Sequence, residues 1–128
     1  MRVPLSQIHP GQRLKVINEA NGNVLVQRLQ LALRWGSRLR GLLGHAPLSD
    51  GEGMLLMPCN GVHTCFMGYT IDALFLDDEA RIHRLVEELA PWRFTAVHAE
   101  AVATLELAAR AAARAGVAAG DRLVFEEY

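Results

Sequence analysis

The chain has 128 residues and a formal net charge of −1 at pH 7, with 51% apolar and 21% charged residues. This length and composition are typical of one globular domain with a single core, so we expect residues 1–128 to form one domain. A net charge close to zero provides no overall field that would attract nucleic acid or an anionic membrane surface. We therefore expect no nucleic-acid partner.

The sequence also carries signals about its compartment. No apolar run approaches the roughly 18 residues that a membrane-spanning helix needs. Residues 1–14 carry an early arginine without the continuous apolar segment of a secretory signal. Two cysteines are too few for a disulfide framework and fit reduced thiols or a local redox pair. The sequence therefore predicts a cytoplasmic protein without a membrane span.

The first part of the chain predicts a hairpin. Residues 16–17 and 24–32 are expected to be strands, and Asn21-Gly22 between them supplies the positive φ angles of a tight turn. A short helix is expected next, at residues 37–43, where Ser37 can cap the first turn and three leucines form an apolar stripe.

Strands dominate the middle of the chain. Residues 54–57, 62–67 and 71–76 are each expected to form a strand, because turn-forming residues separate these apolar segments. The segment Ala73–Leu76 is apolar at every position, which indicates a strand covered on both sides. Residues 80–89 alternate in polarity and predict a further strand.

The tail allows two interpretations. Residues 98–117 are so rich in alanine, leucine and glutamate that helix propensity alone predicts one long helix. The alternative ends a strand at Leu107, runs a shorter helix over residues 108–115, and caps it at Gly116 before a final strand.

Several motifs occur together in a recognisable order. They are SRLRGLLGH, GEGMLLMPCNGVHTCFMGYTIDALFLD, TLEL and GVAAGDRLVF. In this order and spacing they resemble the bacterial and archaeal family called domain of unknown function 192, over about residues 34–125. The Pro-Cys…His-Thr pattern at residues 58–64 is similar to one branch of that family.

The resemblance implies an α+β, mainly β fold: a compact antiparallel β-barrel-like domain with one or two short helices. It also favours the strand-plus-helix interpretation of the tail. No activity is established for the family. Some relatives carry export signals or lie beside pilus or secretion genes, which implies an accessory role at the envelope.

The segment 58–77 holds the residues with the most chemistry. On an extended strand His63, Cys65 and Met67 point to one face, and a turn at residues 60–61 can fold Cys59 back towards them. Such a set, completed by Met67 or Asp72, offers donors that suit zinc or copper(I). The Cys-x-x-Cys pairs typical of structural zinc sites are absent, and no cofactor is otherwise expected.

Two thiol functions are alternatives to a metal site. Cys59 or Cys65 can be a nucleophile with His63 as its base, although no oxyanion-hole motif accompanies them. A Cys59–Cys65 redox bridge is a second alternative. Burial in the core is a third, because cysteine is among the most frequently buried residues.

Two acidic residues also have structural interpretations. Asp72 can cap a turn through backbone amides or bind an arginine, because a buried carboxylate needs partners. Glu106 is expected to be an outward-facing strand residue or the partner of such an arginine. Arg38 and Arg40 are the candidate arginines for both.

Together these residues predict a cleft with apolar walls and a few polar groups, the usual form of a small-ligand site. The leading hypothesis is a non-enzymatic binding or accessory module for a small molecule or an extended protein segment, with pairing at a sheet edge as one mode. A metal- or cysteine-dependent, hydrolase-like enzyme using Cys59 and His63 is the second hypothesis, and a purely structural protein is the third. The ligand-binding candidates are Cys59, His63, Thr64, Met67, Asp72, Arg38 and Arg40.

Overall fold

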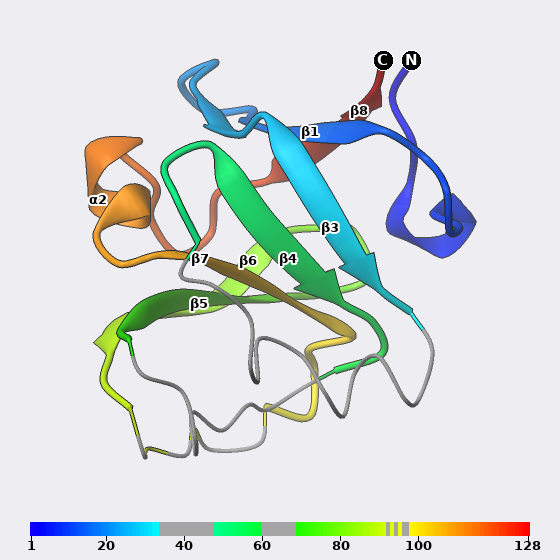
Figure 1. Ribbon diagram of the computed structural model, residues 1–128. Coiled ribbons are helices and arrows are strands. Elements are labelled where there is room, and N and C mark those ends of the chain that lie inside the picture. Colours follow the sequence, from blue (N-terminus) through cyan, green and yellow to red (C-terminus); the bar gives the residue numbers. More distant parts are fainter. Residues whose placement is uncertain (34–47, 60–68, 92, 94, 96–97) are drawn as a thin grey trace.

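The computed structural model describes residues 1–33, 48–59, 69–91, 93, 95 and 98–128 (Figure 1). The expected helix at 37–43 and the expected strand at 62–67 lie outside these residues. The elements in chain order are η1 (Leu5–Gln7), β1 (Leu14–Asn18), β2 (Val24–Val26), β3 (Arg28–Ala32), β4 (Glu52–Leu56), β5 (Ile71–Leu76), β6 (Ile82–Leu89), β7 (Ala103–Ala108), α2 (Ala111–Arg114) and β8 (Leu123–Glu127).

The described strands form two sheets. One has three strands in the order β2-β1-β8, and the other has five in the order β3-β4-β7-β5-β6. Strands β3 and β4 run parallel, and every other pair is antiparallel. The prediction of an α+β, mainly β domain is confirmed, as two packed sheets with no closed barrel among the described strands (Figure 1).

The predicted hairpin is present. The amide of Asn18 donates to the carbonyl of Asn23 at 2.8 Å, and the amide of Gly22 donates back to Asn18 at 2.8 Å. Gly22 has a φ of 75°, a conformation that glycine adopts without steric cost. Asn21 does not take a positive φ angle, so Gly22 alone supplies the conformation that was predicted for both residues of the pair.

The prediction of a single strand at residues 24–32 is wrong. It is two strands, β2 and β3, which belong to different sheets. The amides of Gln27 and Arg28 both donate to the carbonyl of Gly51, at 2.8 and 3.0 Å. This distant carbonyl directs the chain away from β1 and into parallel pairing with β4. Gly53 permits the crossing, because a Cβ there would lie 2.8 Å from Cγ2 of Val26.

The main core fills the space between the two sheets. The three-stranded sheet and the five-stranded sheet each contribute fully buried aliphatic or aromatic side chains to it. All six positions of β5 are buried, which confirms the prediction that this strand is covered on both sides. The largest contributors to the main core include Leu14, Val16, Val26, Leu55, Leu74, Leu76, Leu105, Leu107, Leu123 and Phe125.

The tail forms a strand followed by a short helix, which confirms the strand-plus-helix interpretation favoured by the family resemblance and excludes one long helix. Strand β7 lies between β4 and β5, and pairing on both sides overrides the helix propensity of its residues. Arg110 then takes a φ of 71° and Gly116 a φ of 70°, which places a left-handed residue on each side of α2. Backbone pairing thus decides between two conformations that composition alone leaves open.

Candidate functional site

The face of the five-stranded sheet that points away from the main core carries a second cluster. Alternation along β7 directs Leu105 and Leu107 into the main core and Thr104 and Glu106 to the opposite side. We call this opposite side the outer face. It consists of Thr104 and Glu106 with the cluster of Ala32, Leu48, Met54, Leu56, Cys59, Tyr69, Ile71, Val86, Leu89 and Ala108.

Glu106 lies at the centre of the outer face. Register places it directly between Met54 of β4 and Ala73 of β5. The residue is only 4% exposed, and its Oε2 atom has no hydrogen-bond partner among the described residues. Burial raises the pKa of Glu106 from 4.5 to about 7. Glu106 thus lies on the side of the strand that points away from the main core, as predicted, but it is buried there; its predicted alternative partners, Arg38 and Arg40, lie outside the described residues.

Three polar groups accompany Glu106. Burial raises the pKa of Tyr69, and the negative charge of Glu106 raises it further, so the phenol lies within electrostatic reach of the carboxylate. The hydroxyl of Thr104 donates to the carbonyl of Cys59 at 3.3 Å. The amide of Cys59 donates to the carbonyl of Val102 at 3.0 Å. These two bonds fix the backbone of Cys59 against the start of β7, and its half-buried side chain packs on the outer face.

Asp72 lies on the other side of the sheet. It alternates with Ile71 and Ala73, so its side chain shares the inner side with Leu74. The carboxylate is fully buried and accepts three backbone N–H groups. The donors are Glu88 at 2.9 Å and Arg110 at 3.2 Å to Oδ1, and Ala112 at 3.0 Å to Oδ2.

Asp72 therefore forms the backbone cap that the sequence offered as its structural alternative. One carboxylate fixes a strand, β6, and the first turn of α2. The structure does not bring Asp72 together with Cys59, since one serves the inner side of the sheet and the other packs on the outer face.

The remaining sequence-predicted site residues stay predictions. His63, Thr64, Cys65, Met67, Arg38 and Arg40 lie outside the described residues. Within the described ranges, no group of three or more histidine, cysteine, aspartate or glutamate side chains could hold a metal ion. In the same part of the chain, no helix is long and apolar enough to span a membrane.

The outer face can recognise a donor and exchange a proton. An ionised carboxylate accepts hydrogen bonds at both oxygens, whereas the protonated form also donates one. A pKa of about 7 means that Glu106 can take either form close to neutral pH. A few polar groups among apolar walls are the usual composition of a small-ligand site.

Comparisons with known proteins support the fold. The model of the family described as "Uncharacterized ACR" (DUF192) matches residues 16–125. No curated protein shows significant similarity to the sequence. One similar solved structure is a "putative transcription regulator" from Sinorhizobium meliloti 1021, with a TM-score of 0.75 and 25% identity, covering 91% of this chain and 92% of that chain. Another is a protein of unknown function from Novosphingobium aromaticivorans DSM 12444, with a TM-score of 0.75 and 22% identity, covering 94% of this chain and 91% of that chain.

Proposed function

Because the chain belongs to the DUF192 family, whose description assigns no activity, we propose a function from its own residues. The domain is a small binding module that holds a cationic hydrogen-bond donor, a primary amine or a guanidinium group, on the outer face. The observation that carries this proposal is the buried carboxyl of Glu106, whose Oε2 atom has no partner among the described residues.

The energetics of that carboxyl favour a ligand. A buried acceptor without a partner costs roughly 1–3 kcal/mol, and more when it is charged. Asp72 shows how the same fold satisfies a buried carboxylate, with three backbone amides. Glu106 lies in mid-strand, where the backbone amides are already used in pairing with β4 and β5. A bound donor is therefore the partner that the surrounding strands do not supply.

The charge of the site selects a cation. Among the described residues, no ion pair reaches Glu106. Tyr69, which lies within electrostatic reach of this carboxylate, carries no positive charge in either of its protonation states. A ligand ammonium or guanidinium compensates the charge and fills the vacant acceptor at once.

Binding of this kind is an accessory function, because the domain then contributes by holding a ligand and not by changing it chemically. The polar groups described at the outer face recognise a hydrogen-bond donor. Nucleic acid does not fit the same site, because its phosphates would meet a carboxylate in an uncharged surrounding.

The test uses methylammonium chloride as the probe and acetamide as a neutral probe, both at matched ionic strength. Thermal denaturation of the full chain is followed near pH 8. We expect methylammonium to raise the Tm of the wild type and of the exposed control variant Glu87→Gln, and to leave the Tm of Glu106→Gln unchanged.

Calorimetry in two buffers of different ionisation enthalpy gives a second readout. A bound cation favours the ionised carboxylate, so binding near pH 6 to 7 releases protons in the wild type and none in Glu106→Gln. The proposal is overturned if methylammonium does not stabilise the wild type, or if Glu106→Gln responds as the wild type does.

A further inference from the structure

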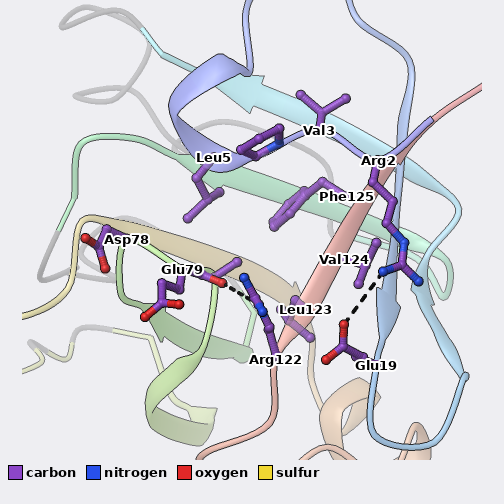
Figure 2. A pocket seen from close by; sticks show the side chains of 12 residues that line it. Arg2, Val3, Leu5, Glu19, Asp78, Glu79, Arg122, Leu123, Val124 and Phe125 are labelled. Carbon is purple, nitrogen blue, oxygen red and sulfur yellow. Dashed lines mark hydrogen bonds and ion pairs between the residues drawn. The ribbon is translucent and has the colours of Figure 1, made fainter.

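A second site lies at the other end of the molecule. It is a pocket of about 340 Å³ between the N-terminal segment, the turn that follows β5, and β8 (Figure 2). All the residues that line it belong to the described part of the chain. They are Arg2, Val3, Pro4, Leu5, Glu19, Asp78, Glu79, Ala80, Arg122, Leu123, Val124 and Phe125.

One part of this pocket is apolar and is formed by side chains of the main core. Leu5, Leu123 and Phe125 are each at most 3% exposed, and all three belong to the main core. The amide of Val3 donates to the carbonyl of Phe125 at 2.8 Å, which attaches the N-terminal segment to β8. An apolar group that enters the pocket therefore meets a wall that is already in place.

The other part of the pocket is charged. The Nε atom of Arg122 donates to the carbonyl of Glu79 at 3.1 Å. Neither Nη group of Arg122 has a partner among the described residues, and the same holds for the carboxylates of Asp78 and Glu79. Figure 2 shows these three side chains on the side of the pocket across from Leu5 and Phe125.

A rigid turn positions the acidic groups. Oδ1 of Asp77 accepts the amides of Glu79 and Arg81, each at 2.9 Å. Ala80 takes a φ of 62°, and its carbonyl accepts the amide of Leu123 at 2.9 Å. The turn is thus bonded to β8, which fixes the backbone of Asp78 and Glu79 relative to that of Arg122.

We propose that this pocket binds an α-amino acid with an apolar side chain. The ligand carboxylate takes the two Nη groups of Arg122, its ammonium lies against Asp78 and Glu79, and its side chain packs on Leu5 and Phe125. This site is separate from the outer face and does not depend on the function proposed for it.

Charge complementarity selects this class of ligand. A simple anion at Arg122 would be repelled by two carboxylates, and a simple cation at the carboxylates would be repelled by the guanidinium. A zwitterion with both charges on one carbon meets an opposite charge at each end. Arg2 does not alter this balance, because it already pairs with Glu19 at 3.8 Å. The volume falls in the range of roughly 300–1,000 Å³ that is usual for small-molecule sites.

The test is a titration of the ¹⁵N-labelled full chain followed by NMR. The probes are L-leucine and three truncated relatives: glycine without the side chain, 3-methylbutylamine without the carboxylate, and 4-methylpentanoate without the ammonium. We expect L-leucine to shift the amides of β8 and of the turn that follows β5, and each truncated probe to bind at least about tenfold more weakly.

Variants assign the contacts. Arg122→Gln is expected to weaken L-leucine about tenfold, because the carboxylate contact is lost, and to bind 3-methylbutylamine at least as tightly as the wild type, because the repulsion of its ammonium is removed. Asp78→Asn weakens L-leucine and binds 4-methylpentanoate at least as tightly as the wild type for the corresponding reason. Arg13→Gln removes an exposed arginine that does not line the pocket and serves as the control, and the unliganded spectrum of each variant reports whether it folds.

The proposal is overturned if L-leucine binds no more tightly than 3-methylbutylamine or glycine, or if its shifts lie away from the pocket. It is also overturned if Arg122→Gln and Asp78→Asn both fold and both keep wild-type affinity. Glu106→Gln is expected to bind L-leucine as the wild type does, which separates this result from the outcome at the outer face.

Discussion

The burial of Glu106 predicts an unusual dependence of stability on pH. Burial raises the pKa of this carboxyl from 4.5 to about 7 in the folded protein. A group whose pKa is higher in the folded than in the unfolded state stabilises the fold below the lower pKa, and that contribution is lost as the pH rises through the upper one. At 1.36 kcal/mol for each pH unit between these two values, the loss is about 3 kcal/mol.

Glu106→Gln isolates this loss, because the amide keeps the shape of the carboxyl and does not titrate. Urea denaturation of both proteins is compared at about pH 4.5 and pH 8.5. The free energy of unfolding of the variant minus that of the wild type should rise by about 3 kcal/mol between the two pH values. Any fixed cost of the extra amide N–H groups cancels from this difference.

Glu87→Gln, which replaces an exposed carboxyl on β6 by the same amide, is the control for the substitution itself. A pH-independent difference between Glu106→Gln and the wild type would refute the reasoning. A variant that became relatively less stable at the higher pH would do so too.

Further outcomes follow from the same contacts. Asp72→Ala should lower the free energy of unfolding by about 3 kcal/mol or more in chemical denaturation, because three backbone amides lose their acceptor; a loss below about 1 kcal/mol would contradict the capping role. The pKa of Tyr69 is raised partly by the charge of Glu106, so it should fall in Glu106→Gln in an ultraviolet titration, with the second tyrosine of the chain as an unchanged reference. Gly53→Ala should destabilise by about 1–3 kcal/mol, because the new Cβ lies 2.8 Å from Cγ2 of Val26; additional truncation of Val26 to alanine should recover part of that steric loss, and no recovery would argue against the contact.

Local sequence chemistry predicted the elements that depend on neighbouring residues. The Asn21-Gly22 turn and the doubly covered strand Ile71–Leu76 are examples, because a positive φ angle and an unbroken apolar segment are visible in the sequence itself. The division of residues 24–32 was not visible. Its cause is the carbonyl of Gly51, which lies far along the chain and accepts the amides of Gln27 and Arg28.

The roles of the candidate site residues also depended on contacts that the sequence alone does not show. Asp72 stood out in the sequence, and the structure explains it by a cap rather than by a ligand. Glu106 was expected to be an outward-facing strand residue or the partner of Arg38 or Arg40, and its burial was not foreseen. Strand β7 is covered on both sides, and a sequence pattern cannot distinguish a covered polar position from a solvated one. One feature of the sequence could have indicated that Glu106 is buried: its neighbours on the same side of the strand, Thr104 and Ala108, are small and uncharged.

The pairing of β1 with β8 has a consequence for the order of events during synthesis. Residues Leu14–Asn18 pair with Leu123–Glu127, so the three-stranded sheet joins two segments more than 100 residues apart. The ribosome must translate the whole segment between β1 and β8 before β8 can cover its share of the main core. Until then the nascent chain exposes the apolar inner side of the five-stranded sheet, the type of surface on which chaperones act. The domain is therefore expected to complete its fold only after β8 has left the ribosome.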